Sequence, residues 1–148
     1  MAKDIQLSKH FKLSEFIRSA TATAKKIDNT PSLEVVSNLQ QLCIHVLEPL
    51  REHFNCPITI SSGYRCPALN KAVGGVATSQ HMTGEAADIH LPSTAIGRKW
   101  FTWLMDQDFD QLILEKSTPT STSYWIHVSY RQDGRNRHQV IEGLVKNR

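Results

Sequence analysis

Three residues with metal-binding side chains stand out because of the sequence around them. His81 lies in a polar loop, whereas Asp88 and His127 each lie in an otherwise apolar stretch, residues 86–89 and 125–128. Burying a carboxylate or an imidazole costs several kcal/mol unless a partner compensates for the lost water. Two neutral imidazoles and one carboxylate are a common zinc-binding set that leaves the fourth position to water. The three residues are therefore candidate metal ligands.

The elements that must carry these residues follow from hydrophobic periodicity. From Pro31 to Phe54, apolar residues recur at steps of three and four, which predicts a helix with one buried stripe, including Leu33. Thr30 is the predicted N-cap, with Pro31 at the first helical position. Pro49 lies inside this pattern, where it must remove one hydrogen bond and is expected to kink the last turn.

The rest of the chain alternates short strands with short helices. We expect strands at 57–61, 86–91, 109–115 and 124–130, helices at 67–73 and 93–105, and a loop at 76–84. Residues 139–145 fit either a strand or a helix. Without regular βαβ alternation, this pattern predicts an α+β fold with a small, largely antiparallel sheet flanked by helices.

Length and composition narrow the possible classes of protein. A chain of 148 residues with 40% hydrophobic and 21% charged residues is typical of one globular domain. A net charge of +3 is too small to indicate a nucleic-acid binder. The apolar runs are too short to insert into a membrane, and the first residues lack the apolar core of a signal peptide. We expect cytoplasmic synthesis and a monomer.

Several motifs together resemble the zinc-dependent D-Ala-D-Ala carboxypeptidase family. Residues 61–65 read SSGYR, residues 81–88 fit HxxGxAxD, and residues 125–127 fit WxH. Relatives in that superfamily include L-alanyl-D-glutamate endopeptidases, the D-Ala-D-Ala dipeptidases of vancomycin resistance and the amino-terminal domain of Hedgehog proteins. Residues 13–16 and 28–31 resemble the phage-associated branch. The resemblance implies a Hedgehog-like fold and one zinc peptidase domain over residues 1–148, with a core at about 13–130.

The family pattern can be carried over to particular residues. It implies that His81, Asp88 and His127 bind Zn²⁺, and that Arg65 meets a carboxylate or peptide carbonyl of the substrate. A guanidinium is suited to that task because its fork of donors matches a carboxylate.

The general base departs from the family pattern. In the endopeptidase relatives a Glu lies three residues before the last His, but here that position is Tyr124, and the His of some carboxypeptidases, two residues before, is Trp125. Glu115 is the best remaining candidate. If its strand pairs antiparallel with residues 124–130, Glu115 lies across from Trp125 and shares a face with His127. A slip of one residue would turn it away.

Four further residues are candidate substrate contacts. Ser79 and Gln80 precede the first ligand and are expected either to bind substrate or to fix the loop. Trp125 and Tyr64 are expected to form walls of the cleft, although core packing explains either equally well.

The resemblance implies a zinc peptidase that hydrolyses peptidoglycan stem peptides, as a carboxypeptidase or an endopeptidase. Without a signal peptide, such an enzyme fits a phage lysin or prophage hydrolase that reaches the cell wall by other means. The alternative is a catalytically silent, metal-bearing binding module, as in Hedgehog proteins, because the expected Glu before the last His is missing.

Overall fold

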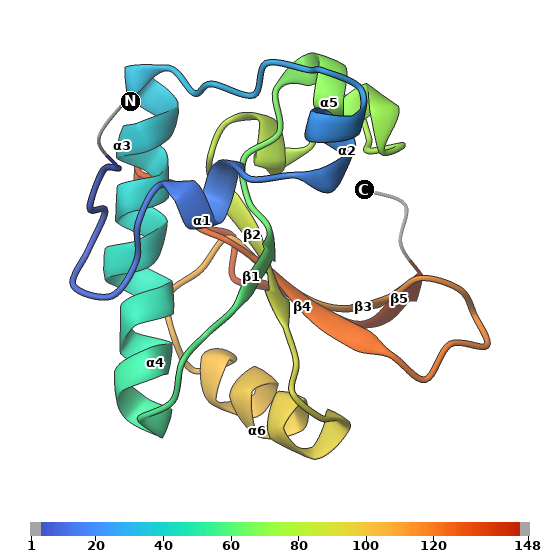
Figure 1. Cartoon of the computed structure of the whole chain (residues 1–148). Coiled ribbons are helices and arrows are strands. Elements are labelled where there is room, and N and C mark those ends of the chain that lie inside the picture. The colour runs from blue at the N-terminus through green and yellow to red at the C-terminus, as the bar shows by residue number, and fades with distance from the viewer. Residues whose placement is uncertain (1–3, 146–148) are drawn as a thin grey trace.

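The fold was examined in a computed structural model, which describes residues 4–145 (Figure 1). Its helical segments are α1 (Ser14–Ile17), α2 (Ala20–Ala24), α3 (Leu33–Leu42), the π-helix η1 (Cys43–Leu47), α4 (Glu48–Phe54), α5 (Pro67–Ala72), the 3₁₀ turn η2 (Gln80–Met82) and α6 (Thr94–Leu104). Its strands are β1 (Ile60–Ser62), β2 (Ala86–His90), β3 (Gln111–Lys116), β4 (Tyr124–Ser129) and β5 (Gln139–Val145).

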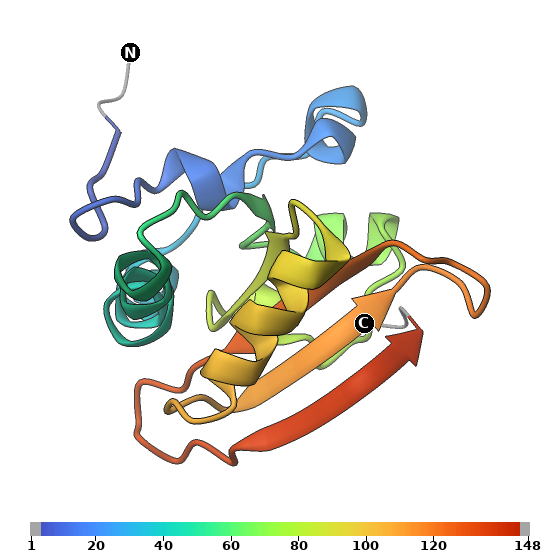
Figure 2. The same cartoon turned by 90° about the horizontal axis from the view of Figure 1, so that it is seen from below.

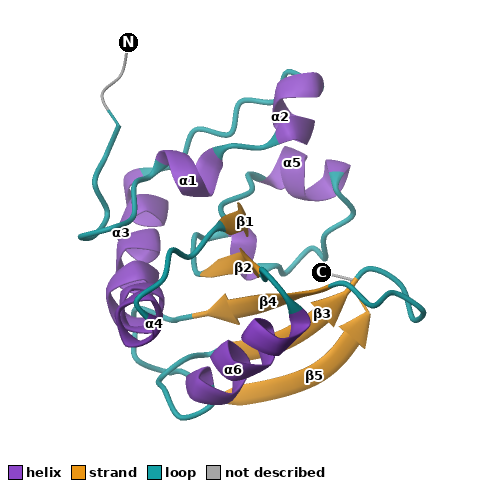
Figure 3. Cartoon of the chain, turned by 60° about the horizontal axis from the view of Figure 1, so that its bottom comes forward, coloured by secondary structure: helices purple, strands orange, loops and turns teal. Residues whose placement is uncertain are grey.

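The five strands form one sheet in the order β1-β2-β4-β3-β5 (Figure 3). The pairs β1/β2, β2/β4 and β3/β4 are antiparallel, and β5 pairs parallel to β3. The predicted α+β class and largely antiparallel sheet are therefore confirmed. Residues 139–145, for which two structures remained open, are a strand.

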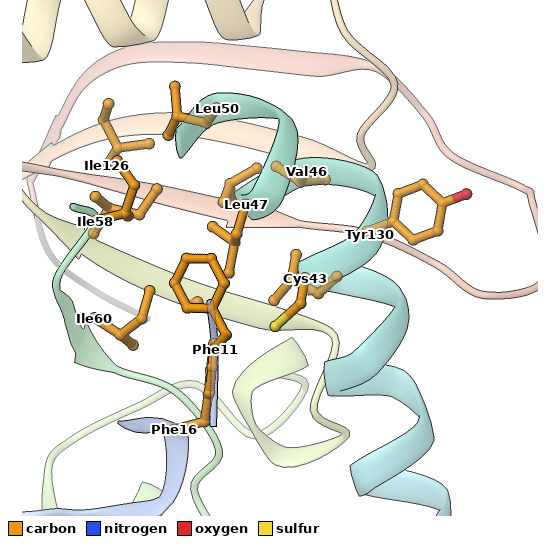
Figure 4. Close-up of a cluster of buried hydrophobic side chains, with 14 of the residues drawn as sticks. Phe11, Phe16, Cys43, Val46, Leu47, Leu50, Ile58, Ile60, Ile126 and Tyr130 are labelled. Carbon is orange, nitrogen blue, oxygen red and sulfur yellow. The ribbon is translucent and has the colours of Figure 1, made fainter. Parts of the chain in front are cut away.

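Alternation along the strands separates the core from the opposite face of the sheet. Leu112, Leu114, Ile126, Val128 and Ile89 point to one face and belong to one buried apolar cluster, whereas Ile113, between the two leucines, is buried on the opposite face. That cluster also contains residues of α3, η1, α4 and α6, and Figure 2 shows α6 lying over the sheet. Figure 4 shows helix residues such as Val46 and Leu50 beside strand residues such as Ile126. The other face is left to Asp88, Glu115 and His127.

Ordered structure is also present on both sides of residues 13–130, the expected core of the domain. Leu7 and Phe11 are buried before residue 13, and β5 continues the sheet beyond residue 130. Residues 1–3 and 146–148 lie outside the described part of the chain.

The start of the long helix differs from the prediction. The N-cap is Ser32, whose Oγ accepts a hydrogen bond from the Val35 backbone N–H. Thr30 is instead held by Asp28, which accepts bonds from its backbone and its hydroxyl, so the helix cannot begin there. Leu33, the first helical residue, is 88% exposed and is not part of the buried stripe.

Pro49 is accommodated by a change of helix type rather than by a break. The π-helix η1 ends at Leu47, so Pro49 lies in the first turn of α4, where its missing N–H is least costly. The three segments follow one another as one rod along the side of the sheet (Figure 1).

The segment before α1 is anchored on α4 through the buried Glu48. Its carboxylate accepts hydrogen bonds from the Ser8 hydroxyl (2.7 Å) and the His10 backbone N–H (2.5 Å), and lies 2.8 Å from His10 Nδ1. Burial raises the pKa of Glu48, but the bonds from His10 and Ser8 outweigh it and hold the pKa below its usual value. The carboxylate is therefore charged at neutral pH.

We expect Glu48→Gln to lower the free energy of unfolding by about 1–3 kcal/mol at pH 7, because it leaves buried donors without a charged acceptor. A carboxyl whose pKa is depressed by folding stabilises the protein above its unfolded pKa and loses that effect as the pH falls through the folded pKa. The difference between the variants should therefore shrink below about pH 4.3, the unfolded value. Denaturant titrations at several pH values measure it, with the exposed Glu52→Gln as control. An equal loss of unfolding free energy in both variants would show that Glu48 does not anchor the segment before α1.

Candidate metal centre

The three predicted ligands meet on the face of the sheet that does not pack against α3 and α6. Asp88 is directly paired with His127 across β2 and β4, and η2 brings His81 over the same spot. One ligand atom from each residue lies within 4.8 Å of the others. Asp88 Oδ1 is 3.3 Å from His81 Nε2 and 3.0 Å from His127 Nδ1.

The local structure fixes which nitrogen His81 presents. His81 Nδ1 lies 2.7 Å from the carbonyl oxygen of Gly63, which can only accept, so this nitrogen carries the proton. Nε2 is then the nitrogen that faces Asp88, where it carries a second proton or, in its place, binds a metal ion. A backbone carbonyl that orients a ligand imidazole in this way is usual at zinc sites.

The site favours a negatively charged Asp88. Burial raises the pKa of this carboxyl, but the charge of His81 and the hydrogen bonds from His127 and His81 outweigh it, so the pKa lies well below its usual value. Both imidazoles are nearly inaccessible, at 1% and 3% exposed for His81 and His127. An oxygen and two nitrogens this close need only small shifts to reach the zinc–ligand distances of about 2.0–2.2 Å. The donor set therefore fits a zinc ion.

Glu115 lies beside this cluster. The predicted register is confirmed, since Glu115 pairs with Trp125 and so shares a face with His127. Its carboxylate is buried, with 2% of the residue exposed, and Oε1 lies 3.9 Å from His127 Nδ1.

Arg65 lies buried near both carboxylates. Burial lowers the pKa of its guanidinium, and the charges of Asp88 and Glu115 oppose that shift. Its Nη2 donates to Ser79 Oγ at 3.3 Å, and its backbone N–H donates to the His81 carbonyl oxygen. Arg65 therefore belongs to the same cluster as the candidate ligands.

Ser79 fixes the loop, one of the two roles expected of it. Its Oγ accepts a hydrogen bond from the His81 N–H and one from Arg65. Gln80 is joined to Asp110, because its Nε2 donates to Asp110 Oδ2 at 2.8 Å.

Two cavities flank the cluster. The first, here called the arginine cleft, has a volume of about 350 Å³ and is lined by Arg18, Tyr64, Arg65, Asp88 and Trp125, among others. Tyr64 lines this cavity and is also part of the apolar core, so core packing accounts for its burial. The second, here called the glutamine pocket, has a volume of about 240 Å³ and is lined by Gln80, Gln111, His127 and Arg137, among others.

Asp110, Arg137 and the carbonyl of Gly63 were missed by the sequence reasoning. Asp110 lies inside the segment 109–115 that was expected to be a strand, so a carboxyl among buried residues could have been noticed there, and it is fully buried. Arg137 gave no signal beyond its charge, and a backbone carbonyl gives none at all.

A comparison with families of known proteins decides what kind of protein holds this site. Residues 9–129 match the Peptidase M15 family, which is most of the chain. The chain belongs to the Peptidase M15 family. A search of curated proteins finds no match. The site of this peptidase thus combines a His-Asp-His candidate metal centre with a buried Glu and a buried Arg. Within residues 4–145, no helix has both the length and the apolar character needed to cross a membrane.

Proposed function

We propose that this protein is a zinc peptidase that hydrolyses peptide bonds in peptidoglycan stem peptides. The observation that carries the proposal is the convergence of His81, Asp88 and His127 beside the buried carboxylate of Glu115 in a Peptidase M15 chain. A zinc ion held by the three residues would supply a water of lowered pKa and a positive charge near the scissile carbonyl.

Glu115 is the proposed general base. It takes a proton from the attacking water while the oxygen bonds to the carbonyl carbon, and it returns that proton to the leaving amine as the C–N bond breaks. Its position supports the role, since it is within 3.9 Å of one candidate ligand and Arg65 balances its charge.

Arg65 is proposed to bind a carbonyl or carboxylate of the substrate and to stabilise negative charge on the carbonyl oxygen. Ser79 holds the guanidinium in place from the metal-binding loop. Trp125 and Tyr64 are proposed to be walls that the peptide contacts in the arginine cleft.

The nature of the arginine cleft supports the proposed substrate. Two arginines, Arg18 and Arg65, and one carboxylate residue, Asp88, line it together with Ser19, Thr21 and Ser61. Stem peptides carry several free carboxylates, so opposite charges attract them to this cleft. The resemblance of residues 13–16 and 28–31 to phage-associated relatives supports a phage or prophage enzyme that acts on the bacterial cell wall.

Mass spectrometry of purified muropeptides incubated with the zinc-loaded protein tests the proposal. We expect new products, which disappear after treatment with a strong chelator and return when zinc is added back. Release of a single alanine identifies a carboxypeptidase, whereas a split inside the stem identifies an endopeptidase. Zinc binding without any product would contradict the proposal and favour the silent binding module.

A further inference from the structure

The glutamine pocket lies across the candidate metal centre from the arginine cleft. In the strand order β1-β2-β4-β3-β5, the cleft is lined by Ser61 and Ser62 of β1, whereas the pocket is lined by Gln111 at the start of β3. The candidate ligands Asp88 and His127 come from the two strands between them. A peptide that crosses the metal centre therefore has a polar cavity on each side.

The carboxamide of Gln80 has a fixed orientation in this pocket. Its Nε2 donates to Asp110 Oδ2 at 2.8 Å. Asp110 is fully buried, and although burial raises its pKa, the hydrogen bonds from Arg137 and Gln80 hold the pKa below its usual value. A carboxylate only accepts hydrogen bonds, so the NH₂ of Gln80 must face it. Its Oε1 points elsewhere, is buried, and accepts no hydrogen bond from residues 4–145.

Arg137 donates three hydrogen bonds to the carboxylate of Asp110. Its backbone N–H (3.0 Å), Nε (2.9 Å) and Nη2 (2.9 Å) all donate to the carboxylate. The backbone of Asp110 is also paired, with Ser129 on one side and Gln139 on the other. Arg137 and Gln139 lie beyond residue 129, where the match to the family ends. The segment after β4 therefore completes this pocket.

We propose that Gln80 is a substrate-binding residue whose Oε1 accepts a backbone N–H of the peptide in the glutamine pocket, and that Asp110 and Arg137 are positioning residues that hold the carboxamide for it. The inference rests on the proposed function and adds a second binding site on the far side of the scissile bond. A buried acceptor without a partner is uncommon in native proteins. Because Oε1 is buried before substrate binds, the peptide N–H reaches it only as the side chains around the pocket shift.

The kinetic constants of Gln80→Ala on a purified muropeptide test the inference. We expect KM to rise about tenfold, the usual effect of one buried hydrogen bond, with kcat changed much less. Zinc affinity should stay at the wild-type value, because His81 is held by Ser79 and Gly63. The melting temperature should fall only slightly, because Asp110 loses the bond from Gln80 but keeps those from Arg137. Gln107→Ala is the matched control, since its Nε2 donates to the Trp103 carbonyl oxygen in another part of the fold.

Asp110→Asn tests whether the orientation of the Gln80 carboxamide matters for its contact with the peptide. An asparagine keeps the shape but can donate to Gln80 Oε1, so the carboxamide is free to turn over. We expect KM to rise, as in Gln80→Ala. In the double variant, KM should be no higher than in Gln80→Ala alone, because both changes remove the same hydrogen bond.

A substrate with a methylated backbone nitrogen identifies the donor. If Gln80 accepts that N–H, methylation raises KM for the wild type but adds nothing in Gln80→Ala. An unchanged KM in Gln80→Ala, or a loss of zinc affinity that explains the whole effect, overturns the inference while the peptidase proposal stands. Absence of wild-type turnover on every muropeptide overturns both.

Discussion

Glu115→Gln should retain zinc and lose nearly all hydrolysis, with kcat reduced by about 10²–10⁴-fold. The substitution keeps the size and shape of the side chain but removes the ability to accept a proton. Glu115 is 2% exposed and lies beside His127. A carboxylate at the surface of the protein therefore cannot readily act as the base in its place. Muropeptide turnover and zinc content, measured on the same preparation, check the result.

Glu85→Gln is the matched control for this prediction. Glu85 directly precedes β2 and lies between His81 and Asp88 in the sequence. Its Oε1, however, accepts a hydrogen bond from Thr83, and the residue lines a different cavity. We expect normal turnover from this variant. Retained turnover in Glu115→Gln would exclude Glu115 as the base. No candidate would then replace the Glu that precedes the last His in the endopeptidase relatives.

The meeting of Asp88, His127 and Glu115 could be predicted because strand alternation gave the face of each residue and the family resemblance joined Asp88 to His127. A charged residue inside an apolar strand must face away from the core, and each strand showed this pattern clearly. The register between β3 and β4 then followed from pairing the two strands end to end, which the structure confirms for Glu115 and Trp125.

The network around Gln80 could not be predicted, because no local pattern joins its members. Gln80 begins η2, whereas Asp110 and Arg137 lie just before β3 and β5, and the parallel pairing of these two strands brings Arg137 to Asp110. Parallel pairing of β5 brings Gln139 opposite Gln111, and a short apolar segment gives no sign of its partner strand.

The errors along the long helix have a local cause. Thr30 and Ser32 are both good N-cap residues, and the choice between them depends on Asp28, which occupies Thr30 with two hydrogen bonds. The periodicity of apolar residues likewise gives no sign of the π-helix that precedes Pro49. None of these positions is a candidate ligand, so the prediction of the metal centre did not depend on them.

Asp88→Asn should abolish tight zinc binding and, with it, hydrolysis. Asp88 supplies the only candidate ligand with a negative charge, and its Oδ1 lies between the two imidazoles. Loss of a direct ligand should lower zinc affinity by more than the 10–100-fold that changes in outer-shell partners typically cost. Competition with a chromophoric chelator measures that affinity, with the exposed Asp106→Asn as control.

The same variant distinguishes a resident metal from adventitious binding by exposed histidines. Zinc that binds only the folded wild type stabilises it by mass action, by about 4 kcal/mol at a free concentration 1,000 times the dissociation constant. We expect this stabilisation in the wild type and in Asp106→Asn, and not in Asp88→Asn. If zinc stabilised Asp88→Asn equally, the ion would be bound elsewhere, and the cluster on β2, β4 and η2 would not be the metal centre.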